Sequence, residues 1–566
     1  MVDFSSTRFP HLLSWTKSRL LSKLKTPSIA PGRESHEKPW SSSGPPPTTF
    51  RLANKEFPKV TWWREPGLRH LYLLLLVPLM TSMVNGYDGS MMNALQTSGQ
   101  WQDYFHHPRG SLLAFYNLAF ALGQLVAVIP FPFPATIADK LGRRWGVVIG
   151  SIIAIIGVAV QSASINVGMF VAGRFIVGFG VMIDHGSAPL MVTELAHTQH
   201  RATITAVYNS TWYFGSIVAA WVTFGTININ SEWAWRIPSI IQAFPAIVQI
   251  MFIWFLPESP RFLIAKDRHE EALEVLVKFH GNGERTDFVE TSFTEIKETL
   301  ALEREFSSKS GWLDLISTPG NRKRTLICYL QGFFSQWCGN GLVSYYLVPV
   351  LETIGITKNA EQAGLNGGLQ IWNFIVAIWA AFNIDRFGRR KMVLGSTGSM
   401  IVCFVLWTIL SARYNITGDG ADAKGVIVMI FLFYTAFNCG WQGLVLAYPI
   451  EILPYEIRAK GLNVTFFGVS SSLLNQYINP VGIESQGWRF YIFYDVFLCV
   501  IFVVVYFLWV ETKNTPLEEI AKFFDGEEAK VGGGASTSTS AAVLSQMRAK
   551  NADFDEEVTH VETHEA

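Results

Sequence analysis

The sequence predicts an all-α membrane protein with twelve membrane-spanning helices in two pseudo-symmetric halves of six. Charged residues make up only 16% of the 566 residues, whereas an ordinary soluble domain has about 25%. Apolar residues instead come in blocks of about 20, the length that crosses a hydrocarbon core of ~30 Å. The pattern Asp-x-x-Gly-Arg-Arg occurs twice, at 139–144 and at 385–390, once in each half.

Twelve apolar blocks support this fold class, six on either side of a charged stretch. Lys+Arg and Asp+Glu number 45 each, so there is no basic excess for binding nucleic acid. The five cysteines are widely spaced and show no metal-ligand pattern, so neither a metal nor another cofactor is expected. The expected spans cover residues 70–91, 112–132, 146–165, 168–190, 204–226, 237–256, 325–348, 364–384, 392–411, 425–448, 461–480 and 489–510.

The spans divide the chain into five parts. The Ser- and Pro-rich start and the low-complexity end are typical of disordered tails. The charged stretch between the halves has helical apolar spacing, which favours short amphipathic helices outside the bilayer; a flexible linker is the alternative. The expected parts are an N-terminal tail (1–69), a first six-helix bundle (70–257), the amphipathic linker (258–323), a second six-helix bundle (324–510) and a C-terminal tail (511–566).

Lys and Arg in the short loops predict the orientation of the spans. They concentrate in the loops on the side of the two tails, and such loops are cytoplasmic in most membrane proteins. Both termini and the linker are therefore expected in the cytoplasm, with the chain crossing the plasma membrane. Asn415, in an Asn-Ile-Thr triplet, would then face the outside and is a candidate glycosylation site.

A second pair of matching positions strengthens the internal repeat. Glu194 precedes Arg201 by seven positions after span four, and Glu451 precedes Arg458 by seven after span ten. Repeated halves around a central site are the plan of transporters that open alternately to each side. We expect the paired charges to lock the halves together at the cytoplasmic face while the outer side is open. The expected gating residues from this repeat are Asp139, Arg143, Glu194, Arg201, Asp385, Arg389, Glu451 and Arg458.

These loops, together with other short motifs, resemble the sugar porter family of the major facilitator superfamily over about residues 70–520. Gly173-Arg174-Phe175 opens span four, Pro257-Glu258-Ser259-Pro260-Arg261 closes span six, and Glu511-Thr512-Lys513 follows span twelve. The start of span one and the loop from Glu451 look most like fungal lactose permease-like and hexose transporters. The resemblance implies the major facilitator fold and adds Glu258, Arg261 and Glu511 to the gating residues.

A sugar site needs amides for its hydroxyls and aromatic rings for its C–H faces. Span seven offers such side chains close together, and span ten offers more. The resemblance implies that Gln336, Asn373 and Asn209 are sugar ligands, although the family has a second Gln where this chain has Ser335. The full set of expected ligands is Asn209, Gln331, Gln336, Trp337, Asn340, Tyr345, Asn373, Asn438, Trp441 and Gln442. For each of them, a hydrogen bond between helices is the alternative role.

Asp88 in span one is the candidate for proton coupling. A carboxylate inside a membrane needs a partner or a proton, and Arg174 in span four is the comparably placed cation. The resemblance pairs these two positions in proton-coupled sugar porters; a permanent salt bridge without proton transfer is the alternative.

The function expected from these observations is secondary active transport of a sugar, a hexose or a disaccharide such as lactose or cellobiose. We expect the protein to work by alternating access, to couple sugar to protons and to function as a monomer. The alternatives are a sensor that binds sugar without moving it, and a carrier of another polyhydroxy compound or secondary metabolite. An enzyme is disfavoured because the chain has no G-x-S-x-G, H-E-x-x-H or phosphate-loop motif.

Overall fold

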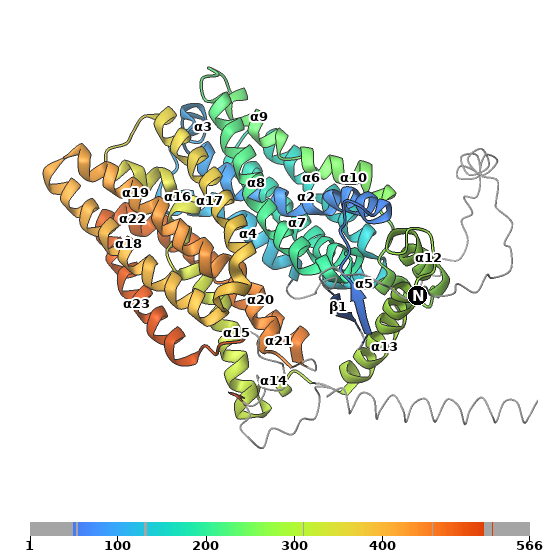
Figure 1. Cartoon of the computed structure of the whole chain (residues 1–566). Helices are drawn as coiled ribbons and strands as arrows, with labels where there is room; N and C mark the ends of the chain where they lie inside the picture. The colour runs from blue at the N-terminus through green and yellow to red at the C-terminus, as the bar shows by residue number, and fades with distance from the viewer. Residues whose placement is uncertain are drawn as a thin grey trace, which may run out of the picture. The chain divides into compact units, whose positions relative to one another are not determined.

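The computed structural model describes residues 49–52, 55–128, 133–309, 311–454, 457–513 and 523–524 (Figure 1). The chain separates into residues 1–48, which lie outside the described part, and one compact unit that starts at Thr49. Most of the two expected tails also lies outside the described residues. Everything below concerns the compact unit.

The first half contains six membrane-crossing segments in chain order. The second segment is followed by α5 (Phe133–Lys140), and α3 (Gly99–Tyr104) connects the first two. The six segments are α2 (Pro66–Leu95), α4 (Gly110–Val128), α6 (Arg143–Ser162), α7 (Val167–Leu195), α8 (Arg201–Thr226) and the combined α9 (Trp233–Ile241), α10 (Phe244–Phe252) and η3 (Ile253–Phe255).

The second half repeats this order, and the twelve-helix prediction is confirmed. Three of its segments are interrupted helices. The segments are α15 (Pro319–Trp337) with α16 (Asn340–Glu352); α17 (Asn359–Phe387); α18 (Arg389–Thr417); α19 (Gly420–Phe437) with η4 (Asn438–Gln442) and α20 (Gly443–Ile452); α21 (Arg458–Val469) with α22 (Ser472–Gln486); and η6 (Gly487–Phe490) with α23 (Tyr491–Leu508).

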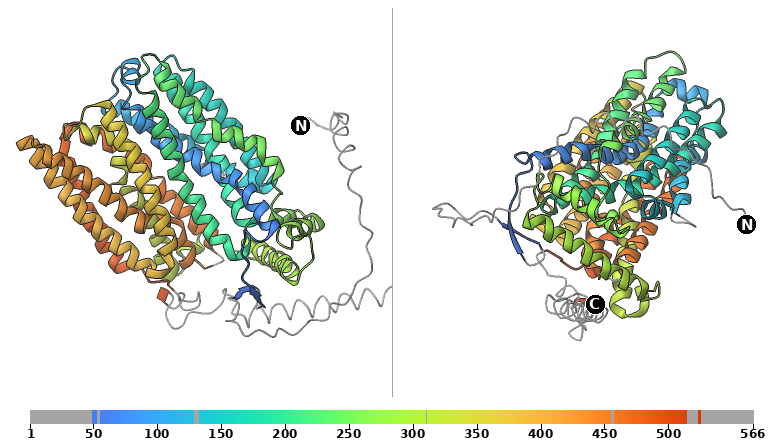
Figure 2. Two further views of the ribbon diagram at one scale, coloured as in Figure 1. Left: turned by 45° about the horizontal axis from the view of Figure 1, so that its top comes forward. Right: turned by 90° about the vertical axis from the view of Figure 1, so that its right-hand side faces the viewer.

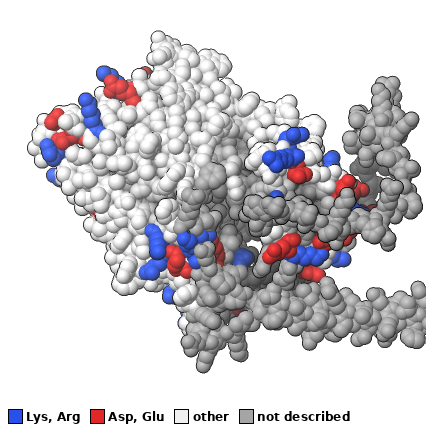
Figure 3. Space-filling view, viewed as in Figure 1, with Lys and Arg blue, Asp and Glu red and all other residues white. Residues whose placement is uncertain are grey.

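Eight stretches of the described chain are long and apolar enough to cross a membrane by themselves, and the last of them, Lys460–Leu508, covers two segments. The three segments that fall short are α8, α15–α16 and α17. These are the helices that carry many of the amide and aromatic side chains expected to bind substrate. On the face shown in Figure 3, Lys, Arg, Asp and Glu gather toward two ends and leave an uncharged band between them.

Close helix contacts in the first half depend on glycines. A Cβ on Gly150 of α6 would lie 2.7 Å from the carbonyl oxygen of Gly180, and a Cβ on Gly180 of α7 would lie 2.7 Å from that of Gly150. Such small residues let two backbones approach in a membrane, where packing rather than the hydrophobic effect joins helices. The backbones of the two helices therefore lie in close contact at these glycines.

The linker between the halves is helical, as its apolar spacing predicts. We call the end of the membrane helices next to it the linker end, and the opposite end, where α2 ends at Leu95, the far end. The linker contains α11 (Pro260–Ala265), α12 (His269–Phe279), α13 (Asp287–Lys309) and α14 (Asp314–Ser317).

The segment before α2 differs from the expected disorder. Strands β1 (Thr49–Leu52) and β2 (Lys55–Pro58) form an antiparallel hairpin beside α13 (Figure 2). The rings of Phe50 and Phe57 pack against Phe288 with centroids 5.9 and 5.4 Å apart, and Lys55 pairs with Asp287 at 2.7 Å. Composition alone did not predict this because the hairpin is stabilised by the distant linker.

Candidate functional site

A buried ion pair lies in the core of the first half. Arg174 of α7 donates to both carboxylate oxygens of Asp88 on α2, with Nη1–Oδ1 at 3.1 Å and Nη2–Oδ2 at 3.0 Å. Gln242 donates a further hydrogen bond of 2.8 Å to the same carboxylate, and Arg174 Nε donates to the carbonyl oxygen of Tyr116. The side chains of Asp88 and Arg174 are 1% and 2% exposed, so the two charges compensate each other away from water. The sequence predicted this pairing; a coupling role stays a prediction.

A chain of polar side chains connects the two halves near this pair. Tyr213 of α8 donates a hydrogen bond to Asn438 Oδ1, and Asn438 Nδ2 donates to Asn373 Oδ1 at 3.2 Å. Asn438 begins the π-helical turn η4, a rare geometry that is frequent at functional sites. Asn438 and Asn373 were expected ligands, and the structure brings them together.

Aromatic side chains lie close to Asp88 on the side facing the second half. A Cβ on Gly89 would meet the Trp212 ring at 3.4 Å and the Tyr345 ring at 3.9 Å. Trp212 belongs to the first half and Tyr345 to the second. Rings from both halves therefore approach the residue next to the buried acid, an arrangement suited to the C–H face of a sugar.

The other expected ligands have varied surroundings. Gln336 and Gln442 are half-buried, and Asn209 is exposed on α8. Asn340 accepts a hydrogen bond from Tyr434 through its backbone oxygen at 2.7 Å. Their role as sugar ligands stays a prediction.

Three expected ligands point into the packing of the second half. Gln331 Oε1 accepts a bond from Trp509 Nε1 at 3.1 Å, and Trp441 Nε1 donates to Thr397 at 3.0 Å. Trp337 stacks on Phe333 with centroids 5.5 Å apart. These contacts correspond to the alternative role of interhelical contact.

Tyr213 and Trp212 were missed by the sequence analysis. Both follow Asn209 by one helical turn, and this spacing was the available signal. The rotation of α8 decides which of these side chains faces the second half, and sequence alone does not give that rotation.

The repeated motifs form two matching clusters at the linker end. Arg143 donates through Nε to Glu194 at 3.0 Å, and Arg389 pairs with Glu451 at 2.9 Å. Each pair lies within one half. Each pair therefore ties together helices of a single bundle, and a lock between the halves stays a prediction for the state in which the outer side is open.

Two further acids cap the helices that follow the glycines. Glu258 accepts a hydrogen bond from the backbone N–H of Arg143 at 3.2 Å, and Glu511 accepts from that of Arg389 at 2.8 Å. A carboxylate at a helix N-terminus satisfies free N–H groups and complements the helix dipole. Glu258 and Glu511 thus occupy equivalent positions at the first turns of α6 and α18.

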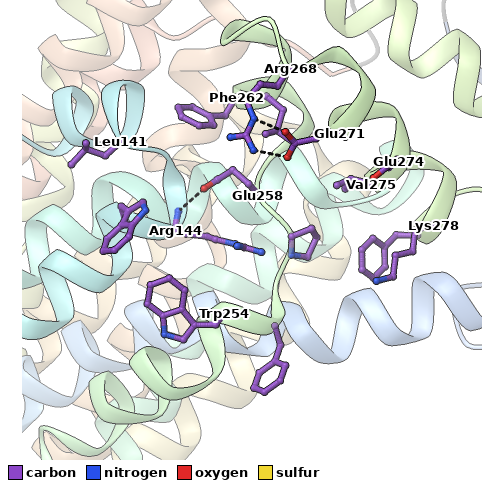
Figure 4. Close-up of a pocket in the computed structure, with 15 residues that line it drawn as sticks. Leu141, Arg144, Trp254, Glu258, Phe262, Arg268, Glu271, Glu274, Val275 and Lys278 are labelled. Atoms are coloured by element: carbon purple, nitrogen blue, oxygen red, sulfur yellow. Dashed lines mark hydrogen bonds and ion pairs between the residues drawn. The ribbon is translucent and has the colours of Figure 1, made fainter. Parts of the chain in front are cut away.

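A pocket of about 470 Å³ lies beside the first of these clusters, with Arg144 and Glu258 among the residues that line it (Figure 4). The side chain of Arg144 extends between Trp254 and Glu258 toward the α12 residues across the pocket, and its Nη2 donates to the carbonyl oxygen of Leu256. Arg390 in the second half makes the equivalent bond to the carbonyl oxygen of Tyr506 at 2.6 Å. The repeat thus extends to the second arginine of the motif.

The remaining gating residues surround these clusters. Asp139 is an exposed partner of Arg143 at 3.5 Å, and Arg458 donates to the carbonyl oxygen of Leu453 at 3.3 Å. Arg201 is the exposed first residue of α8, and Arg261 lies in α11. Asp385 lies in the last turn of α17, and its side chain is outside the described residues.

Histidines fill the contact between the linker and the loop that follows α7. His197 stacks on Phe288 with centroids 4.6 Å apart and lies 5.5 Å from His280. Burial, with a smaller contribution from neighbouring charges, lowers the pKa of His197 to about 3, and burial lowers the pKa of His280 to about 4. Both rings are therefore neutral at physiological pH.

Comparison with known proteins agrees with this architecture. The family model "Sugar (and other) transporter" matches residues 74–524. The MFS-type transporter oryC of Aspergillus oryzae is 31% identical over 429 residues, covering 74% of this chain and 78% of its own length. High-affinity glucose transporter 1 of Candida albicans is 27% identical over 479 residues, covering 81% and 87%.

Solved structures show the same fold. The inward-open xylose transporter XylE from E. coli superposes with a TM-score of 0.66 at 20% identity, over 80% of this chain and 100% of that one. The proton:xylose symporter XylE bound to 6-bromo-6-deoxy-D-glucose gives 0.64 at 20% identity, over 81% and 99%. The chain therefore belongs to the sugar (and other) transporter family of the major facilitator superfamily.

Proposed function

We propose that this protein carries a sugar across the plasma membrane by alternating access and couples it to proton movement. The observation that carries this proposal is the buried Asp88–Arg174 pair beside side chains contributed by both halves. Amides from Asn373 and Asn438 can bind hydroxyl groups, and the Trp212 and Tyr345 rings can cover the apolar face of a sugar. Relatives named as glucose transporters and a proton:xylose symporter of the same fold support this choice.

The proton step follows from the environment of Asp88. While Arg174 donates to both oxygens, the carboxylate is stable in its charged form. If sugar binding separates the pair, the buried carboxylate loses its compensation and takes up a proton. Binding of sugar and binding of the proton are then linked through one ion pair.

We place the linker end in the cytoplasm, following the distribution of Lys and Arg. Two bundles, residues 70–257 and 324–510, move relative to each other during transport, and residues 258–323 connect them. Both tails lie in the cytoplasm. In this arrangement Asn415, exposed in the last turn of α18, is accessible for glycosylation. The same arrangement makes this structure closed to the outside, because hydrogen bonds join the halves at the far end. The protein needs no second copy for this cycle, so we expect a monomer.

The test is uptake of labelled glucose, xylose, lactose and cellobiose by cells that lack their own hexose and disaccharide carriers. We expect at least one sugar to accumulate above its external concentration, with alkalinisation of an unbuffered medium and loss of both effects on adding an uncoupler. If a sugar enters the cells but does not accumulate above its external concentration, its transport is not coupled to protons. Absence of entry for every sugar, with intact protein in the membrane, would leave a sensor or a carrier of another polyhydroxy compound.

A further inference from the structure

Helix α16, the second part of the seventh segment, is broken near the far end. Tyr346 has φ −136° and ψ 33°, which is not helical, although helix continues on both sides. In an unbroken α-helix the N–H of Leu347 would donate to the carbonyl oxygen of Val343. Pro349, three residues after the break, has no N–H to offer the carbonyl oxygen of Tyr345.

Asn93 of α2, from the other half, takes the place of the missing helical bond. Its Oδ1 accepts the N–H of Leu347 at 3.0 Å, and its Nδ2 donates to the carbonyl oxygen of Val343 at 3.1 Å. One amide therefore replaces both members of a broken i to i+4 pair. Asn93 is 1% exposed, so water does not serve these groups.

Gln96, one turn further along α2, completes the arrangement. Its Nε2 donates to the carbonyl oxygen of Tyr345 at 3.0 Å, which is the group that Pro349 leaves without a helical donor. Three backbone groups of α16 are thus satisfied by two side chains of the opposite half. In a membrane protein such groups need an internal partner, because each unsatisfied one costs several kcal/mol.

We propose that Asn93, together with Gln96, is the positioning residue that holds α16 in its broken form and thereby keeps the far end closed. This inference rests on the alternating-access cycle proposed above. When α2 moves away, the N–H of Leu347 and the carbonyl oxygen of Val343 lose Asn93 and bond to each other, which straightens the helix. The Val343–Leu347 pair is then satisfied in both positions of the halves, whereas the carbonyl oxygen of Tyr345 has its donor only while Gln96 is near; intermediate positions leave buried groups unpaired.

The test compares Asn93→Leu and Asn93→Ser with wild type in lipid nanodiscs without any sugar. Spin labels at His107 and Lys358, exposed positions of the two halves at the far end, report the separation of the halves after Cys403, Cys439 and Cys499 are changed to Ser. Loss of the two bonds to α16, and of a longer one of 3.4 Å from Asn93 Nδ2 to Asn366 Oδ1 in the same half as α16, should move the population toward the separated state by roughly 5- to 150-fold. Asn93→Leu has a similar shape but cannot bond, so it should show the larger shift.

Asn475→Ala is the matched control, because Asn475 is also a buried amide but its bonds to Tyr494 and Asn479 stay within the second half. It should leave the label distances unchanged. In cells that transport, Asn93→Leu should lower kcat more than it raises KM, since it alters the cycle and not the sugar contacts. Label distances identical to wild type in both Asn93 variants, with normal thermal stability, would overturn the inference. Since no sugar is present, that result would not bear on the transport proposal.

Discussion

Arg174 holds Asp88 through both of its terminal nitrogens, at 3.1 and 3.0 Å, inside a bundle core that excludes water. Asp184 in α7 is a second buried acid in the same half, but its bond is to the Thr81 hydroxyl at 2.9 Å. The same bundle therefore contains a carboxylate paired with a cation and one bonded to a neutral group. This difference provides a test for coupling.

We predict that Asp88→Asn abolishes sugar accumulation, because an amide cannot take up a proton. Removing one partner of a buried pair costs about 3–5 kcal/mol, so the thermal midpoint should also fall. Accumulation ratio and medium pH on sugar addition measure the effect. Asp184→Asn is the matched control and should still concentrate sugar; if Asp88→Asn concentrates it too, Asp88 is not the coupling residue.

Substitutions of the expected amide ligands Asn373 and Gln336 should weaken sugar binding. Asn373→Ala and Gln336→Ala each remove an expected bond to a hydroxyl, which is worth about 1 kcal/mol or roughly fivefold in apparent KM. Initial uptake rates at varied sugar concentration measure this. Asn321→Ala, at the linker end of α15, removes an amide far from the site and should leave KM unchanged. Unchanged KM in Asn373→Ala and Gln336→Ala would show that these residues are not ligands.

Tyr213→Phe separates the contact between halves from the sugar contact. It deletes only the hydroxyl that bonds to Asn438, so we expect a change in kcat with a smaller change in KM. A double-mutant cycle with Asn438→Ala measures the coupling between the two residues. Additive effects of the two changes would mean that their contact plays no part in the transport cycle.

The sequence predicted the features that follow from its internal repeat and from the spacing of its apolar residues. The Gly-Arg-Arg motifs located the clusters around Arg143 and Arg389, and apolar block lengths located the helices. The sequence did not predict the partners of Asn93: Pro349 marks a kink in the preceding turn, but which side chain of the other half serves the freed backbone groups depends on how α2 packs against α16. It also did not predict that η4 is π-helical or that Phe50 and Phe57 find Phe288. Those features arise from contacts between distant segments, which local pattern does not encode.

Acidification should destabilise the linker contact through His197. Burial lowers the pKa of this ring to about 3 from an unfolded value near 6.5, so the unfolded chain binds more protons between these values. The stabilisation is complete above about pH 6.5 and falls by about 1.4 kcal/mol per pH unit below it. Thermal midpoints measured from pH 7.5 to 5 should fall less in His197→Phe than in wild type. The exposed His107→Gln is the control and should follow wild type; equal slopes in all three proteins would contradict the assignment.

The glycine of each repeated motif should be intolerant of a side chain. Gly388 has φ 92°, and a Cβ there would lie 2.8–3.0 Å from the Glu511 carboxylate that caps α18. Gly388→Ala should therefore cost about 1–3 kcal/mol from backbone strain, and it should also displace the cap. Gly395, inside α18, has open space around it, so Gly395→Ala should gain about 0.5–1 kcal/mol. Thermal midpoints of the two purified variants, measured in one detergent, test this difference. Gly142→Ala should lower stability in the same way in the first half, where a Cβ would lie 2.7 Å from Glu258. Equal midpoints for Gly388→Ala and Gly395→Ala would show that Glu511 does not require the glycine.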